Sequence, residues 1–253
     1  MNILETILNV KRQEIQRIKD FEFGEMAGQN RSLKDALSKP GISVIAEIKM
    51  KSPSEGEIFR YADPAHIAKG YESAGAAAIS VLTDQSFFGG SLDILKSVRG
   101  AVSIPVIRKD FIIVQKQISE TIHYNGDAFL LIADALNQDS LQQLMNIGKM
   151  AGLEFLVEFH DEKHAEFISA LNPETVGINC RNLKKMATDI TYFEKMISSL
   201  PSNSVKVAES GIHTSDNLKY VSDLGYDAAL IGTSLMKTGN PGKALEELLG
   251  RLS

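Results

Sequence analysis

The stretch from Ile42 to Gly56, ISVIAEIKMKSPSEG, is an apolar run rich in β-branched residues that ends in two ionisable groups, Glu47 and Lys49, and then breaks into Ser-Pro-Ser. Such a run predicts a buried β-strand followed by a loop. Side chains alternate along a strand, so Glu47 and Lys49 should project to the same side. Charged residues are seldom buried unless they are paired or used in chemistry. The pair is therefore either a structural ion pair or part of a functional site.

The same kind of run recurs along the chain and predicts the fold. The expected strands are Ser43–Glu47, Ala78–Leu82, Pro105–Lys109, Ala128–Ile132, Glu154–Glu158, Thr175–Asn179, Val205–Glu209 and Ala228–Gly232. Segments with helical spacing lie between them, at Pro64–Ala74, Leu92–Val98, Gln115–Tyr124, Leu141–Ala151, Lys163–Leu171, Tyr192–Ser199 and Ser215–Leu224. Near-continuous apolar strands are typical of a parallel sheet covered on both faces. This alternation predicts an α/β protein, a single (β/α)₈ TIM barrel over residues 1–253. A doubly wound open sheet is the alternative, but no GxGxxG turn follows the first strand.

Residues 1–41 precede the first expected strand and form an N-terminal helical extension. Apolar residues recur there at helical spacing, with charged residues between them: Ile3, Leu4, Ile7, Leu8, Ile15 and Ile18 alternate with Lys11, Arg12, Glu14 and Arg17. This pattern predicts an amphipathic helix. Helical periodicity of this kind favours packing against one end of the barrel. A role as a lid over the active site is compatible with such packing.

Composition limits the function further. With 253 residues, 43% hydrophobic and 23% charged, the chain has the make-up of a soluble globular protein, and its net charge of -5 argues against a nucleic-acid partner. Cys180 is the one cysteine, which excludes an intrachain disulfide. His160 and His164 are four apart, but Glu162 does not complete the HExxH pattern of zinc enzymes. We expect no metal and no cofactor, no membrane contact, a cytoplasmic location and a monomer.

Polar residues stand at the expected carboxyl end of nearly every strand, where barrel enzymes carry their catalytic groups. These residues are Glu47, Lys49, Thr83, Asp84, Lys109, Asp110, Asp134, Glu158, Asn179, Arg181, Glu209, Ser210 and Gly232 to Ser234. A ring of structural salt bridges would be spread over both ends of the barrel. The bias toward one end therefore favours a functional site.

The last two strand ends have a composition suited to an anion. Gly211 follows Ser210 in VAESGI, and Gly232 precedes Thr233 in LIGTSLM. Small residues let backbone N–H groups approach an anion, and barrels frequently bind phosphate at the loops after strands seven and eight. Either loop alone is explained as a plain turn. Together they predict a small phosphorylated substrate.

Seven ordered motifs, AEIKMKSPSEG, VLTDQSFFGGSLDIL, IPVIRKDFII, LVEFHD, GINCRNL, VAESGI and LIGTSLM, resemble those of the indole-3-glycerol phosphate synthase family. The segment NILETILNVKRQEI resembles the extension that precedes the barrel in that family. The resemblance implies a lyase of tryptophan biosynthesis. Its reaction closes 1-(2-carboxyphenylamino)-1-deoxyribulose 5-phosphate to indole-3-glycerol phosphate with loss of carbon dioxide and water.

The resemblance also implies which residues form the site. Its catalytic positions match Glu47, Lys49, Lys109, Glu158, Asn179 and Ser210, and its substrate-binding positions match Ser52, Arg181, Glu209, Gly211, Gly232 and Thr233. We assign Lys109 as the acid that stabilises charge on the ketone oxygen, and Glu158 as the base. Lys49 would hold the substrate carboxylate or phosphate and share the acid role, and Glu47 would orient a lysine or take part in proton transfer. Ser52 would help to cradle the phosphate, whereas Arg181 either lines the anthranilate side or fixes a loop.

Two other functions are compatible with the residues. One is a different phosphate-handling barrel enzyme, such as a Schiff-base aldolase with Lys109 as the nucleophile, which borohydride trapping with substrate would reveal. The other is a non-catalytic barrel that binds a phosphorylated ligand, which turnover would exclude. Cys180 departs from the Asn or Ser frequent in the family, and side-chain alternation directs it away from Asn179.

Overall fold

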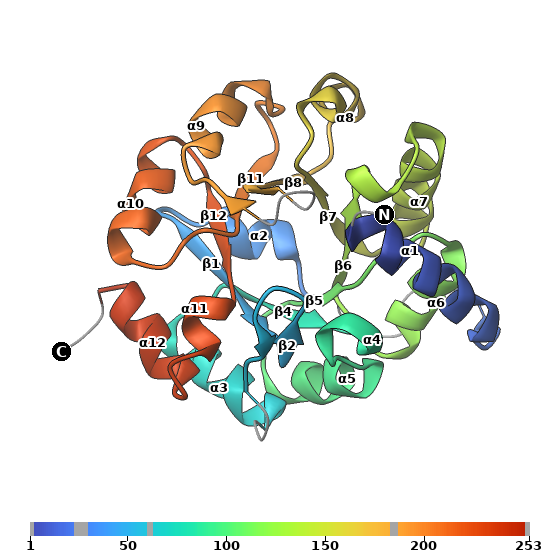
Figure 1. Cartoon of the computed structure of the whole chain (residues 1–253), viewed down its shortest axis with the longest axis horizontal. Helices are drawn as coiled ribbons and strands as arrows, with labels where there is room; N and C mark the ends of the chain where they lie inside the picture. Colours follow the sequence, from blue (N-terminus) through green and yellow to red (C-terminus); the bar gives the residue numbers. More distant parts are fainter. Residues whose placement is uncertain (1–2, 23–29, 60–62, 183–186, 251–253) are drawn as a thin grey trace.

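The computed structural model describes residues 3–22, 30–59, 63–182 and 187–250. Its centre is a closed barrel of eight strands in the order β1-β12-β11-β8-β7-β6-β5-β4, each parallel to its neighbours (Figure 1). The strands are β1 Ser43–Ile48, β4 Ala78–Leu82, β5 Val106–Lys109, β6 Ala128–Ile132, β7 Glu154–Phe159, β8 Thr175–Asn179, β11 Val205–Glu209 and β12 Ala228–Ile231. The predicted (β/α)₈ barrel is confirmed.

The strand ends differ from the prediction by single residues. β1 and β7 each continue one residue further, to Ile48 and Phe159. β5 begins at Val106 because Pro105 has no N–H to donate to the ladder. β12 ends at Ile231, since Gly232 leaves the extended region and becomes the N-cap of the next helix.

Helices surround the barrel between successive strands (Figure 1). They are α3 Pro64–Ala74, α4 Gln85–Phe88, α5 Leu92–Ala101, α6 Gln115–His123, α7 Gln138–Met150, α8 Ala165–Leu171, α9 Tyr192–Met196, α10 Ser215–Asp223, α11 Thr233–Met236 and α12 Pro241–Leu248, with short 3₁₀ turns η2 Ala133–Ala135, η3 Glu162–His164 and η4 Ile197–Ser199. Helix α3 has the predicted bounds because Asp63 caps its start, Pro64 fits its first turn, and Gly75 ends it in the left-handed conformation. Two hairpins, β2 Lys51–Ser52 with β3 Gly56–Glu57 and β9 Arg181–Asn182 with β10 Ala187–Thr188, follow β1 and β8.

The N-terminal extension covers both ends of the barrel. Helix α2, Leu33–Leu37, closes the amino end, where its two leucines are fully buried and the Lys34 N–H donates to Glu154 at the start of β7. Helix α1, Ile3–Glu14, continues into η1 Ile15–Arg17 and lies over the opposite end, where its apolar side lines a cavity. The predicted amphipathic helix is therefore present and packs against one end of the barrel, while α2 closes the other. Residues 1–2 and 23–29 of the extension lie outside the described part of the chain.

The hydrophobic core has two layers. Alternate strand residues such as Val44, Ile79 and Phe129 pack outward against the helices, whereas Ile45, Ile107 and Leu156 fill the barrel interior together with the leucines of α2. This alternation leaves the ends of the strands as the place where inward-facing polar groups can meet. Among the described residues, no helix is long and apolar enough to cross a membrane.

Candidate active site

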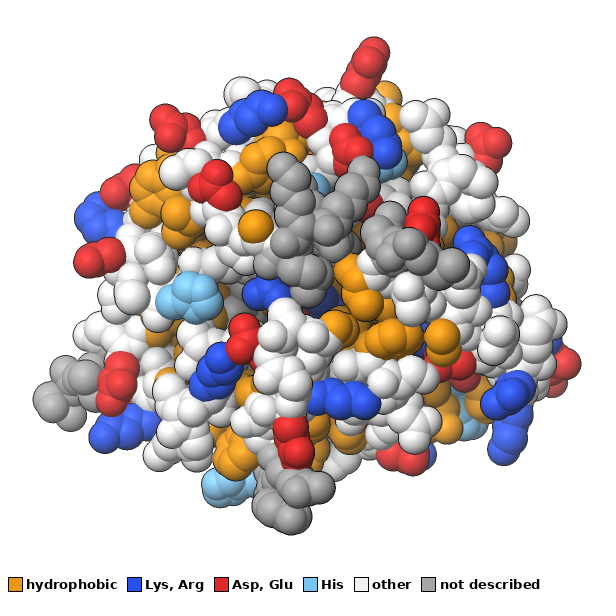
Figure 2. Space-filling view, viewed as in Figure 1, with side chains coloured by type: hydrophobic (Ala, Val, Ile, Leu, Met, Phe, Trp, Pro, Cys, Tyr) orange, Lys and Arg blue, Asp and Glu red, His pale blue; other side chains and the backbone are white. Residues whose placement is uncertain are grey.

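The carboxyl ends of the strands meet at a cavity beneath α1. The cavity is lined by all the sequence-predicted site residues except Glu209: Glu47, Lys49, Ser52, Lys109, Glu158, Asn179, Arg181, Ser210, Gly211, Gly232 and Thr233. In the space-filling view, basic side chains lie at the centre of this face with hydrophobic side chains beside them (Figure 2). Glu209 lies beneath the floor, 1% exposed, and reaches the cavity through its contact with Lys109. The twelve predicted residues therefore form one constellation.

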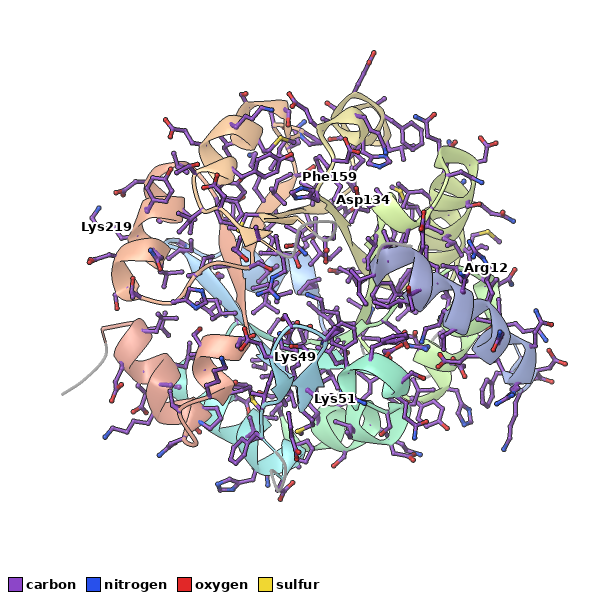
Figure 3. All side chains as sticks on the ribbon, in the orientation of Figure 1. Arg12, Lys49, Lys51, Asp134, Phe159 and Lys219 are labelled. Atoms are coloured by element: carbon purple, nitrogen blue, oxygen red, sulfur yellow. The ribbon has the colours of Figure 1, made fainter. Side chains whose placement is uncertain are left out.

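Lys109 is the centre of the charged cluster. Its Nζ lies 3.1 Å from Glu47 Oε2, 3.3 Å from Glu209 Oε2 and 3.9 Å from Glu158 Oε2. The other oxygen of Glu47, Oε1, lies 2.8 Å from Lys49 Nζ. Glu47 and Lys49 thus do project to the same side of β1, and Figure 3 shows Lys49 near the barrel axis. One buried carboxylate holds both lysines.

Burial and ion pairing shift the pKa values of the acids and lysines in this cluster. Burial by itself raises the pKa of Glu47, but the Lys109 and Lys49 ammonium groups lower it to about 2. Burial likewise opposes the charge on Lys109, yet the carboxylates of Glu47, Glu209 and Glu158 raise the pKa of this lysine above its ordinary value. For Glu209, burial and the neighbouring Glu158 raise the pKa well above the usual range. Glu209 is therefore the acid of the cluster whose pKa is raised, whereas the pKa of Glu47 is lowered.

Glu158 is fixed on its other side by the end of β8. Asn179 donates its Nδ2 hydrogen to Glu158 Oε1 at 2.8 Å and accepts the Arg181 N–H on Oδ1 at 3.0 Å. The His160 ring hydrogen-bonds through Nδ1 to the carbonyl oxygen of Asn179 at 2.8 Å, which makes Nδ1 the donor. Asn179 therefore orients Glu158 toward Lys109.

The loop after β1 forms one wall of the cavity. Arg181 Nη1 donates to Ser54 Oγ at 2.9 Å, and Ser54 Oγ lies 3.3 Å from Ser52 Oγ. Arg181 thereby joins the loop after β8 to the Ser-Pro-Ser segment while it also lines the cavity. A cation and two hydroxyl groups meet on this side, which suits an anionic group of a ligand.

The turn after β11, the strand between β8 and β12, has an unusual backbone. Ser210 has φ of 71° and Gly211 has φ of 72°, two successive residues in the left-handed region. A non-glycine residue held there is strained, and such strain clusters at functional sites. The Cys180 thiol donates to the carbonyl oxygen of Ser210 at 3.3 Å, and burial raises the pKa of this thiol to about 12. Cys180 thus supports the turn as a neutral thiol within the hydrophobic core, whereas Asn179 lines the cavity.

Two glycines make room for the buried carboxylates. A Cβ placed on Gly232 would lie 2.5 Å from Glu47 Oε1, and a Cβ on Gly177 would lie 2.2 Å from Glu209 Oε1. Neither distance is tolerated by real side chains. Gly232 was predicted as a phosphate contact. Its proximity to Glu47 is a second reason why this position needs a residue without a side chain. Gly177, inside strand β8, was not identified from the sequence.

Several site residues were not predicted. Ile3, Leu4 and Ile7 of α1 line the cavity with Phe88, Phe111 and Leu130, and they give it an apolar side suited to an aromatic ring. Their apolar character alone did not distinguish them from core residues. The motif SFFGGS contains two adjacent phenylalanines in a polar loop, and that was the available signal for Phe88.

Among the described residues, no group of three or more His, Cys, Asp or Glu side chains could hold a metal ion. His160 contacts the backbone of Asn179, and His164 Nε2 lies 3.7 Å from Asp134 Oδ1. The two histidines therefore have separate structural contacts.

A parallel barrel with a lysine and carboxylate cluster at its carboxyl end has the form of a (β/α)₈ barrel enzyme, and the cluster contains the groups that acid and base chemistry requires. Two solved structures of low identity share the fold alone: a thiamine phosphate pyrophosphorylase from Pyrococcus furiosus, with TM-score 0.63 and 15% identity over 87% of this chain and 96% of that one, and an N-acetylmannosamine-6-phosphate 2-epimerase from Clostridium perfringens, with TM-score 0.63 and 14% identity over 90% and 100%.

The family model described as indole-3-glycerol phosphate synthase matches residues 4–248. Relatives with that name include proteins from Halalkalibacterium halodurans, 43% identical over 98% of this chain and 97% of the relative, and Mycolicibacterium gilvum, 45% identical over 85% and 79%. Another, from Streptomyces griseus, is 40% identical over 98% and 95%. The chain belongs to the indole-3-glycerol phosphate synthase family.

Proposed function

We propose that this protein closes 1-(2-carboxyphenylamino)-1-deoxyribulose 5-phosphate to indole-3-glycerol phosphate, releasing carbon dioxide and water, as a carboxy-lyase of tryptophan biosynthesis. The observation that carries the mechanism is the cluster in which Glu47 holds Lys49 and Lys109 while Glu158 faces Lys109. It supplies acids and a base at one point of a cavity that has both apolar and cationic walls.

The first step is ring closure. The aromatic carbon that carries the carboxylate attacks the ketone carbon, and the ketone oxygen takes a proton as the new carbon–carbon bond forms. Lys109 is the acid for this step because its three carboxylate neighbours keep it an ammonium and Glu47 fixes its position. Loss of carbon dioxide then restores the aromatic ring.

The second half of the reaction is dehydration. The hydroxyl made from the ketone leaves as water, and the carbon next to nitrogen loses a proton to complete the indole. These transfers need an acid and a base in opposite protonation states. Glu158, oriented by Asn179, is our base, and Lys49 or Lys109 is the acid. Ser210, in its strained turn, lines the cavity and would contact the substrate hydroxyls.

Binding of the substrate anions follows from the walls of the cavity. The phosphate would lie between Ser52 on the first loop and Gly211, Gly232 and Thr233 after the last two barrel strands, all of which line the cavity. Arg181 would attract the substrate carboxylate or phosphate, and the side chains of α1 with Phe88 would cover the aromatic ring.

The cluster does not favour a Schiff-base aldolase. An amine nucleophile must be neutral, and enzymes achieve this by apolar burial or a nearby cation. Lys109 instead has three carboxylates around it, which raise its pKa. Borohydride treatment with substrate should leave the protein without a covalent adduct.

The absence of tryptophan from the sequence gives a direct assay. Product formation introduces the only indole in the cuvette, so indole fluorescence should rise over a weak tyrosine background when enzyme meets the carboxyphenylamino substrate. A flat signal at high enzyme concentration would refute the proposed reaction. A monomeric state and a cytoplasmic location are part of the proposal, and light scattering and cell fractionation test them.

A further inference from the structure

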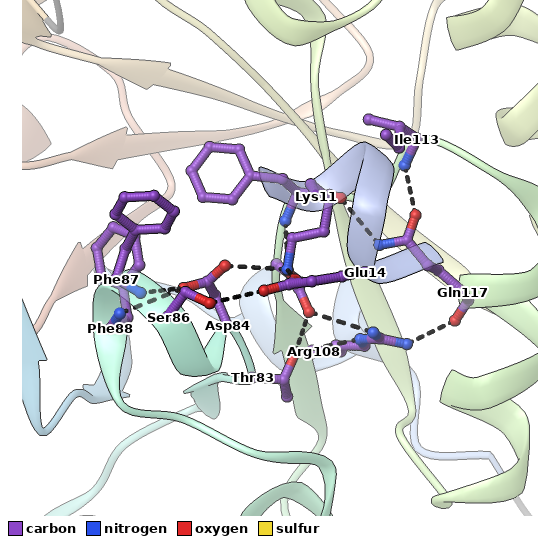
Figure 4. A network of polar contacts seen from close by, with 12 residues as sticks. Lys11, Glu14, Thr83, Asp84, Ser86, Phe87, Phe88, Arg108, Ile113 and Gln117 are labelled. Atoms are coloured by element: carbon purple, nitrogen blue, oxygen red, sulfur yellow. Dashed lines mark hydrogen bonds and ion pairs between the residues drawn. The ribbon is translucent and has the colours of Figure 1, made fainter. Parts of the chain in front are cut away.

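Helix α1 contributes a buried cation beside the active site. Lys11 was predicted on the polar face of an amphipathic helix, but it is 4% exposed. Its Nζ contacts three carboxylates: Glu14 at 2.7 Å, Asp84 at 2.9 Å and Asp110 at 2.8 Å (Figure 4). Burial opposes its charge, yet Asp110 and Asp84 raise its pKa above the ordinary value. Lys11 is therefore a fixed ammonium, outside the cluster around Lys109.

The two aspartates belong to the strand ends that carry the site. Asp110 directly follows Lys109 at the end of β5, and its carboxylate also accepts from Thr83 Oγ1 at 2.7 Å, from Arg108 Nη2 at 3.2 Å and from the Phe111 N–H at 2.8 Å. Asp110 thus sets the direction in which the chain leaves β5. A shift of this carboxylate would shift the backbone of Lys109.

Asp84 likewise sets the direction in which the chain leaves β4. It is the N-cap of α4, and its Oδ1 accepts the N–H groups of Phe87 at 2.7 Å and Phe88 at 3.3 Å. Phe88 and Phe111 both line the cavity, with ring centroids 6.2 Å apart. Each aspartate therefore holds one cavity-lining aromatic residue, and Lys11 is the group that joins the aspartates.

A second line of contacts leads from the same helix to the first loop. Ser86 Oγ donates to Glu14 Oε1 at 2.7 Å, and the Ser86 carbonyl oxygen accepts from Lys51 Nζ at 2.9 Å. Lys51 adjoins Ser52, which lines the cavity. The contacts of α1 therefore reach the loops after β1, β4 and β5.

We infer that Lys11 is a positioning residue for the proposed reaction. Lys11 ties α1 to the loops after β4 and β5 and so sets the placement of Lys109, Phe88 and Phe111. The inference rests on the proposed function for its catalytic consequence. Without Lys11, the fully buried Asp84 carboxylate loses its nearest cation, and an unpaired buried charge is costly enough to displace the loop.

The test compares Lys11→Met, which keeps the length of the side chain without its charge, with Arg12→Met. Arg12 is the next residue of the same helix and is exposed, with a hydrogen bond from Nη1 to Asn9 (Figure 3). At saturating substrate, and at a temperature below the onset of unfolding, Lys11→Met should lower kcat by at least ~10-fold. Misplacement of a catalytic group by about 1 Å lowers the rate by up to ~10²-fold. Arg12→Met should match the parent, and Lys11→Arg should recover most of the loss.

A purely structural role would lower the unfolding temperature and leave kcat per folded molecule unchanged, and that result would overturn the inference. If Lys11→Met does not fold, Asp84→Asn provides the same test, because it removes the charge and keeps an oxygen that can accept the Phe87 N–H. Parent-like kcat in Asp84→Asn would then refute the inference.

Amide hydrogen exchange separates this inference from the proposed reaction. In Lys11→Met, the N–H groups of Phe87 and Phe111 should exchange faster than in the parent and in Arg12→Met, whether or not the parent turns over the substrate. An inactive parent would refute the reaction alone. Unchanged exchange at both amides would refute the role of Lys11.

Discussion

Gly232→Ala tests whether the position of Glu47 controls the reaction. An added Cβ would lie 2.5 Å from Glu47 Oε1 and 2.9 Å from its Cβ, so rotation of the carboxylate alone does not relieve the clash. Ordinary van der Waals contact begins at 3.4 Å, and the Glu47 side chain must therefore retreat by about 1 Å. That movement breaks the 2.8 Å contact to Lys49 or the 3.1 Å contact to Lys109.

The expected cost has two parts. A displacement of about 1 Å at the catalytic cluster should lower kcat by roughly 10²-fold. Overpacking should lower the free energy of unfolding by roughly 1–3 kcal/mol. Gly232 does not have a positive φ, so the alanine brings no backbone strain of that kind, and its N–H stays available for the proposed phosphate contact. KM should accordingly change less than kcat.

The assay is the rise of indole fluorescence at saturating substrate, together with thermal unfolding. Gly100→Ala is the matched control, because this glycine lies in α5 and a Cβ there meets nothing within 4 Å. It should keep parent turnover and be equal or slightly higher in stability. The reasoning fails if Gly232→Ala has the kcat and the unfolding temperature of the parent, or if only KM rises.

The cluster leads to three further predictions. Lys109→Ala should lower turnover by at least ~10²-fold, because it removes the proposed acid, and near-normal turnover would contradict that role. In an infrared titration the carbonyl stretch of the protonated Glu209 carboxyl should persist above pH 4.5 and be absent from Glu209→Gln, because burial and Glu158 raise the pKa of Glu209; loss of that band at pH 4.5 or below would contradict the raised pKa. The pKa of Glu47 is about 2 in the folded protein against 4.5 for a free side chain, so its contribution to stability, on the order of 3 kcal/mol, is complete above pH 4.5 and is lost as the pH falls toward 2. Acid unfolding of Glu47→Gln should therefore have a shallower pH dependence than that of the parent over this interval, and equal slopes would refute the assignment.

Much of the barrel was readable from the sequence because buried parallel strands are short apolar runs with abrupt ends. The expected strand Thr175–Asn179 and helix Pro64–Ala74 agree with the structure at both ends, since polar or capping residues bound them. The short elements α4 and α11 were not predicted, because four residues carry no helical period. Helix α12 was also missed, although Asn240 and Pro241 are a recognisable helix start.

The residues of the candidate site, too, could be predicted only in part from the sequence. Charged residues at strand ends were identified because topology alone brings the carboxyl ends of parallel strands together. The burial of Lys11 was not predictable, since it depends on where α1 crosses the barrel, which helical periodicity does not specify. Gly177 was missed for a similar reason: the need for a residue without a side chain arises from Glu209 on the neighbouring strand.

The most direct test of the proposed reaction uses substrate labelled with carbon-13 in its carboxylate. The account predicts that labelled carbon dioxide and indole fluorescence appear together, at equal rates and in equal amounts, and that both are lost in Lys109→Ala. Indole formation without labelled carbon dioxide, or cleavage of the sugar chain with the label retained on the aromatic ring, would contradict it.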